Sequence, residues 1–149
     1  MGVLVADIKA ARDRFASVTG LTFTEPETRR FANFDDSRGP RPLELTMCYS
    51  LEGPPYLELV QWDPHGGVFG SEHGEGLHHI GFHNDDVAAH LDGLGRNRVA
   101  IESRRFGNRR TDVLRAFITD PASLHGVRLE MVDDQGRIAL EEWLDSLRR

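Results

Sequence analysis

Residues 74–82 contain two adjacent histidines, His78 and His79, at the start of an apolar run. Alternate side chains of a β-strand point to the same face, so His79, Gly81 and His83 are expected to share one face, and His78 is expected to point outward. A histidine directed into an enclosed space, beside a glycine that leaves room, suits a metal ligand. A histidine at a strand end can equally donate a hydrogen bond to a backbone carbonyl and have no metal. Other residues must decide between these two interpretations.

Two glutamates lie in similar apolar surroundings, Glu58 between Leu57 and Leu59, and Glu130 in the sequence Leu-Glu-Met. Alternation turns the apolar neighbours toward a helix layer and each glutamate toward the opposite face. Two carboxylates at equivalent positions, together with His79, favour a metal site over two unrelated surface glutamates. Oxygen and nitrogen ligands of this kind suit Zn, Ni, Co, Mn or Mg.

The chain contains an internal repeat that places Glu58 and Glu130 at equivalent positions. Residues 81–87 repeat the pattern of residues 2–8, and residues 129–131 repeat that of residues 57–59. Apolar periodicity predicts strand-helix-strand-strand-strand in each copy. In the first copy we expect strands at residues 2–5, 21–24, 43–50 and 56–62, a helix between Asp7 and Gly20, and a long loop or irregular strand over residues 25–42. In the second copy we expect strands at residues 77–82, 99–103, 113–119 and 127–132, and a helix over residues 86–94.

The predicted fold is therefore an α+β domain of two βαβββ modules with an added C-terminal helix. The expected boundaries are a first module at residues 1–64, a Gly-rich linker at residues 65–76, a second module at residues 77–133 and the helix at residues 137–147. The apolar face of that helix is expected to cover a sheet edge or a subunit contact.

Composition limits the possible functions. The 149 residues suit one domain, and the formal net charge of −6 argues against nucleic-acid binding. No apolar run approaches the roughly 20 residues that span a bilayer. The single cysteine, Cys48, is expected to be a core residue of a cytoplasmic protein. Among the arginines of residues 104–110, Arg105 and Arg109 are candidates to hold a carboxylate or phosphate of a small-molecule substrate.

These motifs resemble the vicinal oxygen chelate superfamily of glyoxalases, extradiol dioxygenases, bleomycin-resistance-type proteins and methylmalonyl-CoA epimerases. Residues 74–80 and 121–131 are most similar to the epimerase branch. The resemblance implies a curved, barrel-like mixed sheet around a divalent metal, commonly in a homodimer. It also implies that Glu58, His79 and Glu130 are the metal ligands, and that Glu130 or Glu58 serves as the catalytic acid and base.

The expected function is a metal-dependent isomerase, epimerase or lyase that stabilises an enolate or enediolate of a carbonyl or thioester substrate. The first-module histidine of the superfamily would lie one residue before Met1. An upstream start, a water in the ligand position, or loss of the metal would each account for this. The alternative function is metal-free sequestration of a cationic compound, as in bleomycin-resistance proteins.

Overall fold

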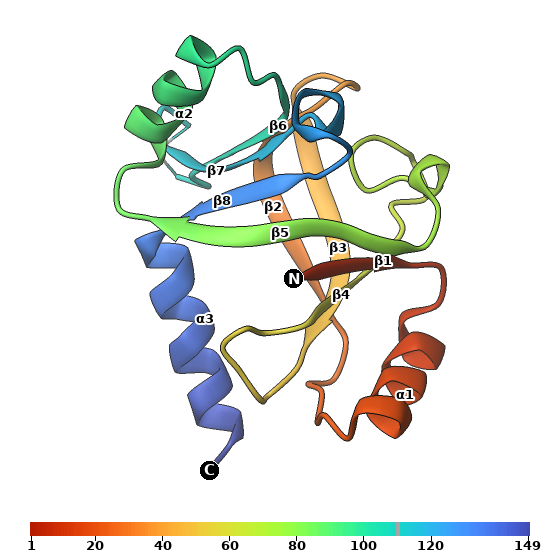
Figure 1. Ribbon diagram of the computed structural model, residues 1–149. Helices are drawn as coiled ribbons and strands as arrows, with labels where there is room; N and C mark the ends of the chain where they lie inside the picture. The colour runs from red at the N-terminus through yellow and green to blue at the C-terminus, as the bar shows by residue number, and fades with distance from the viewer. Residues whose placement is uncertain (110) are drawn as a thin grey trace.

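The computed structural model describes residues 1–109 and 111–149. Within these residues, eight strands close into a barrel in the order β1-β4-β3-β2-β6-β7-β8-β5, with three α-helices outside it (Figure 1). The first half contains β1 (Gly2–Val5), α1 (Ile8–Thr19), β2 (Glu27–Asp35), β3 (Arg41–Tyr49) and β4 (Glu58–Gln61). The second half contains β5 (Gly76–Asn84), α2 (Val87–Arg96), β6 (Ile101–Phe106), β7 (Leu114–Thr119) and β8 (Leu129–Asp133), followed by α3 (Asp134–Leu147).

The two halves have the same internal pairing. Strand β1 is parallel to β4, and β5 is parallel to β8. The halves are joined by two antiparallel pairs, β1 with β5 and β2 with β6, which close the barrel. The predicted α+β fold of two βαβββ units with a C-terminal helix is confirmed.

The largest error of the sequence prediction lies between residues 21 and 42. The strand expected at residues 21–24 is only an isolated bridge between Phe23 and Ser50. The segment expected to be a long loop or an irregular strand contains β2, which pairs with both β3 and β6 and shifts register against β3 between Phe31 and Phe34. Its polar composition and the odd spacing of its two core residues, Phe31 and Phe34, obscure a strand pattern in the sequence, whereas pairing on both sides stabilises the strand.

The helix boundaries follow from their caps. The Asp7 side chain accepts hydrogen bonds from the first turn of α1, and Gly20 ends the helix at φ 75°, as predicted. Helix α3 begins at Asp134, three residues earlier than expected, because the Asp133 carboxylate accepts a hydrogen bond from the Gly136 amide. None of the described helices is long and apolar enough to cross a membrane.

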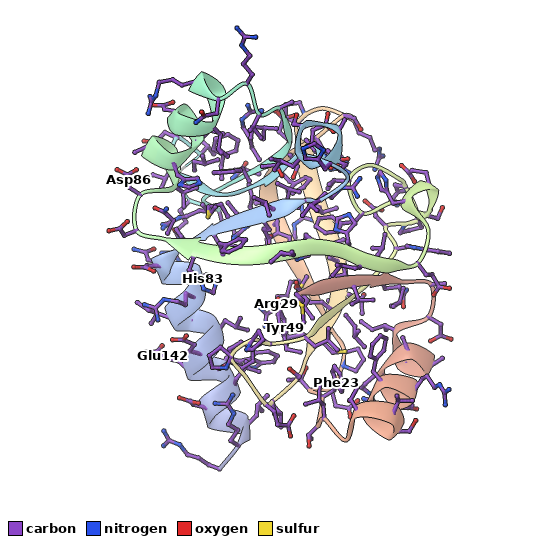
Figure 2. The ribbon with its side chains drawn as sticks, in the orientation of Figure 1. Phe23, Arg29, Tyr49, His83, Asp86 and Glu142 are labelled. Atoms are coloured by element: carbon purple, nitrogen blue, oxygen red, sulfur yellow. The ribbon has the colours of Figure 1, made fainter. Side chains whose placement is uncertain are left out.

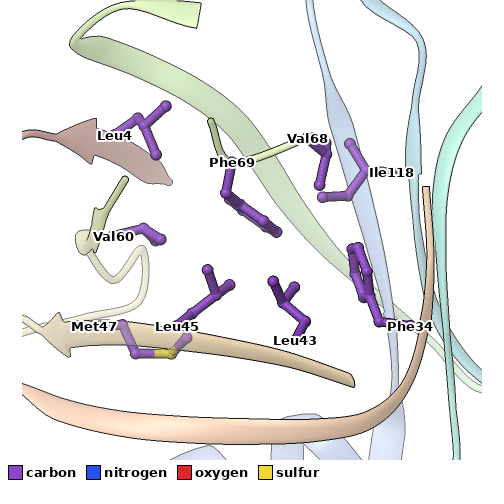
Figure 3. Packing of buried hydrophobic residues seen from close by; sticks show 9 residues of the cluster. All are labelled: Leu4, Phe34, Leu43, Leu45, Met47, Val60, Val68, Phe69 and Ile118. Atoms are coloured by element: carbon purple, nitrogen blue, oxygen red, sulfur yellow. The ribbon is translucent and has the colours of Figure 1, made fainter. Parts of the chain in front are cut away.

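Apolar side chains fill one part of the barrel interior (Figure 3). Val68 and Phe69 belong to this core, so the segment expected to be a simple linker folds back into the barrel. Two smaller clusters lie beneath α1 and α2, and Cys48 is fully buried in the first of them, as predicted for a core residue. The interior cluster consists of Leu4, Phe34, Leu43, Leu45, Met47, Val60, Val68, Phe69 and Ile118.

Candidate metal centre

Glu58, His79 and Glu130 come together on the inner face of the barrel. The Nε2 atom of His79 lies 3.2 Å from Glu58 Oε2 and 3.3 Å from Glu130 Oε2. One potential ligand atom from each residue lies within 4.8 Å of the other two. Ligands at about 2.1 Å from a small divalent ion are roughly 3 to 3.5 Å apart, so the donor set fits such an ion. The residues come from β4, β5 and β8.

Strand β5 directs both histidines inward by an irregularity in its pairing. His79 pairs with Gly2 and Leu77 pairs with Val3, so two steps on β5 match one step on β1. Such a bulge breaks strict alternation, and both His78 and His79 are buried. The sequence had predicted that His78 points outward, and this prediction is wrong. The predicted shared face of His79, Gly81 and His83 is correct, since all three line one cavity.

Gly2 provides the space for the His79 ring. A Cβ atom at position 2 would lie 2.0 Å from Cε1 of His79, far closer than van der Waals contact allows. Any larger residue would displace either the imidazole or strand β1. The absence of a side chain at Gly2 therefore leaves room for the imidazole in its observed position.

Tyr49 holds the Glu58 carboxylate. Its hydroxyl donates a hydrogen bond of 2.5 Å to Glu58 Oε1, while Oε2 faces His79. Burial alone would raise the pKa of Glu58, but its hydrogen bonds with His79 and Tyr49 bring that pKa below its ordinary value. Burial also raises the pKa of Tyr49 well above its ordinary value, which keeps the phenol protonated as a donor. Figure 2 places Tyr49 and Arg29 between the sheet and α3, where Arg29 lies over the rings of Tyr49 and Trp143.

His78 fixes the orientation and tautomer of His79. Its Nε2 lies 2.7 Å from the Val68 carbonyl oxygen, which can only accept, so Nε2 carries the hydrogen. Burial lowers the pKa of His78 to about 3, so the ring is neutral and its Nδ1 accepts. Nδ1 of His79, at 3.0 Å, must then be the donor, and its Nε2 faces the two carboxylates. Burial would lower the pKa of His79, but the two carboxylates raise it above its ordinary value.

The three residues line a cavity of about 660 Å³ whose remaining wall is mostly apolar. Met1, Tyr56 and residues of α3, including Leu140, also line it, so the C-terminal helix contributes to the site. Of the two arginines suggested as substrate contacts, Arg105 lines this cavity, whereas Arg109 lines a second hollow beside it.

Sequence reasoning missed Tyr49 and His78. Tyr49 pairs with Glu58 across the β3–β4 hairpin, so a register for the predicted hairpin would have found it. His78 depends on the bulge, for which the sequence carries no local signal.

A closed βαβββ barrel with a histidine and two carboxylates on its inner face defines a glyoxalase-like protein. Residues 1–117 match the model of the Glyoxalase/Bleomycin resistance protein/Dioxygenase superfamily. This chain belongs to that superfamily. It is 25% identical over 139 residues to the uncharacterized protein YqjC of Bacillus subtilis (strain 168), covering 91% of each.

Solved structures share this fold. A methylmalonyl-CoA epimerase of Streptomyces coelicolor, in complex with 2-nitronate-propionyl-CoA, has a TM-score of 0.61 at 21% identity, over 89% of this chain and 92% of that one. A methylmalonyl-CoA epimerase from Mycobacterium tuberculosis has a TM-score of 0.61 at 17% identity, over 89% and 83%. A hypothetical protein from Bacillus halodurans has a TM-score of 0.63 at 18% identity, over 89% and 90%.

Proposed function

We propose that this protein is a divalent-metal-dependent isomerase or epimerase that moves a proton on a carbon atom next to a carbonyl group. The observation that carries the proposal is the cluster of Glu58, His79 and Glu130 on the wall of a largely apolar cavity. Such a cavity excludes water around the reacting carbon atom and strengthens the electrostatic interactions within it. The glyoxalase-like family and its epimerase neighbours support the same class of reaction.

The two glutamates are suited to different roles. Glu58 is held by Tyr49 and His79, and a carboxylate held at both oxygens suits a fixed ligand. Among the described residues, the only polar partner of the Glu130 carboxylate is His79. The cross-strand neighbour of Glu58 is Tyr49, whereas that of Glu130 is Ile118, which offers no hydrogen bond. Glu130 is therefore free to turn toward a substrate, and we assign it the proton transfer.

Glu58, His79 and Glu130 would hold the metal. When bound, the metal would supply Lewis-acid polarisation of the substrate carbonyl, which makes the neighbouring C–H bond more acidic. The Glu130 carboxylate would take that proton and return it to the same carbon or to its neighbour. Return to the neighbouring atom gives isomerisation, and return to the same carbon after the planar deprotonated substrate has turned its other face toward Glu130 gives epimerisation.

The proposal is tested by metal content and by exchange of substrate protons with deuterium from the solvent. Acyl thioesters are the first substrates to try, since the epimerase neighbours are solved with CoA thioesters, and hemithioacetals are the second. Glu130→Gln should abolish exchange. Glu142→Gln, which makes the same change at an exposed position of α3, should leave exchange unchanged. Exchange that survives Glu130→Gln would contradict the assigned role.

Metal-free sequestration is the second candidate, favoured by the mostly apolar wall of the cavity. It predicts ligand binding that is unaffected by a chelator and by Glu58→Gln. The isomerase proposal predicts instead that both treatments remove activity together with the metal. Elemental analysis of the purified protein, before and after chelation, separates the two functions.

A further inference from the structure

A second hollow, of about 640 Å³, adjoins the cavity of the candidate metal centre. Arg29, Phe31, Arg105 and Gly136 line both spaces, so a ligand that fills the cavity would meet the second hollow along these residues. The second hollow lies over β2 and the β6–β7 hairpin, beside the first turn of α3. It contains none of the three candidate metal ligands.

Positive charge is concentrated around this second hollow. Its lining includes one carboxylate, that of Asp133, in a chain whose formal net charge is −6. A local field opposite in sign to the whole protein attracts anions selectively to this place. The arginines of its lining are Arg29, Arg30, Arg105, Arg109 and Arg115.

Ion pairs already occupy three of these arginines. Arg29 pairs with Glu27, Arg30 with Glu44, and Arg115 with Asp133. The remaining two, Arg105 and Arg109, have no carboxylate partner among the described residues.

Packing fixes the free Arg105 in place. Its guanidinium lies over the Phe31 ring, with 5.2 Å to the centroid, and this contact orients its plane. A guanidinium held by its face keeps the N–H donors at its edge available for an anion. The β6–β7 pairing also shifts register between Arg105 and Phe106.

The hairpin that carries Arg109 is tied to β2. The Ala32 amide donates to Asn108 Oδ1 at 3.0 Å, and Asn33 Nδ2 donates to the Gly107 carbonyl at 2.8 Å. These bonds hold the turn immediately before Arg109 against the sheet. Hydrogen bonds to β2 therefore hold this edge of the hollow in place.

We propose that this arginine-lined hollow binds a diphosphate carried by the substrate, while the carbonyl end of the same molecule lies at the metal centre. The inference rests on the proposed function for the position of the carbonyl. Arg105 and Arg109 supply charge and planar donors for phosphate oxygens, and the paired arginines add to the field. A hollow of about 640 Å³ accommodates a diphosphate and the group attached to it.

Adenosine diphosphate is the probe, titrated by calorimetry into protein treated with a chelator so that no metal contributes. Binding should weaken by about tenfold in Arg105→Gln and in Arg109→Gln, since each loses hydrogen bonds to a charged group. Arg105→Lys keeps the charge but loses the planar fork, and its affinity should lie between those of the parent and Arg105→Gln. The matched control is Arg14→Gln on α1, an exposed arginine that lines neither space. Thermal unfolding shows whether each variant is folded.

The proposal is overturned if adenosine diphosphate does not bind, or if it binds equally well to folded Arg105→Gln and Arg109→Gln. Orthophosphate is titrated in parallel. If orthophosphate binds and the nucleotide does not, the hollow takes a free ion and not a substituent of the substrate, which also overturns it. Metal loading is measured separately. If adenosine diphosphate does not bind but the metal centre is loaded, the proposed function stands and only the proposal for the hollow is wrong. Nucleotide binding without metal loading contradicts only the proposed function.

Discussion

Replacement of His78 by leucine tests whether the ring behind His79 prepares it to bind a metal. The change removes the acceptor for His79 Nδ1 and the donor to the Val68 carbonyl, bonds of 3.0 and 2.7 Å. His79 would then be free to rotate or to adopt the other tautomer, which carries its hydrogen on Nε2. Loss of such a partner to a ligating histidine typically lowers metal affinity by about 10- to 100-fold. That range corresponds to about 1.4 to 2.8 kcal/mol.

The same change has a cost in stability. Val68 is buried, so the loss of its hydrogen bond leaves a carbonyl group without a partner, at a cost of about 1 to 3 kcal/mol. The metal-free variant should therefore unfold at a lower temperature than the parent. Stability and metal affinity must accordingly be measured separately.

The assay is competition for Co²⁺ or Zn²⁺ against a chromophoric chelator, with circular dichroism as the check on folding. His78→Gln should restore much of the affinity, since its amide can donate to Val68 and accept from His79. His90→Leu is the matched control, because His90 contacts Asn84 and Phe117 and lies outside the metal centre. If folded His78→Leu binds the metal as tightly as the parent, the proposed role of His78 is wrong.

Three further predictions follow from contacts of the same site and of the core. Gly2→Ala should reduce metal loading at least tenfold, since the new Cβ would overlap the imidazole of His79. Gly95→Ala is the control, because its Cβ meets open space and should leave the metal content, measured by elemental analysis, unchanged. Tyr49→Phe should weaken metal binding by about two- to tenfold, because it removes one neutral hydrogen-bond donor but keeps the Glu58 carboxylate. Glu58→Gln should weaken metal binding more, and competition with a chelator measures the affinity of both variants. Burial raises the pKa of the Cys48 thiol to about 12, so a thiol reagent at pH 8 should label Cys48 only in denaturant. Labelling of Cys48 in the native protein would contradict its burial.

Sequence patterns were sufficient to predict the fold where local signals agreed with pairing. The Asp7 cap and the Gly20 terminus of α1 are local features, and the structure contains them as expected. Strand β2 was predicted only as a long loop or an irregular strand, because its residues are mostly polar and the strand depends on pairing with its two neighbours, β3 and β6. Long-range pairing of this kind cannot be read from local alternation.

In the candidate site, too, local patterns predicted some features, whereas features that depend on pairing between strands were not predicted. The repeat placed Glu58 and Glu130 at equivalent positions and His79 on the first strand of the second copy, and the barrel brings these three together. The bulge that turns His78 inward depends on the pairing of β5 with β1, so strict alternation gave the wrong direction for its side chain.

The duplication explains the positions of the two glutamates but not the difference between them. Each occupies the equivalent place on the last strand of its half, and each has a cross-strand neighbour on the preceding strand. In one half this neighbour is Tyr49, whose hydroxyl holds the carboxylate of Glu58. In the other half it is Ile118, which is buried and offers no hydrogen bond to the carboxylate of Glu130. A symmetric fold thus contains one carboxylate held by a tyrosine hydroxyl and one whose cross-strand neighbour offers no hydrogen bond, and the proton transfer proposed above is assigned to the second.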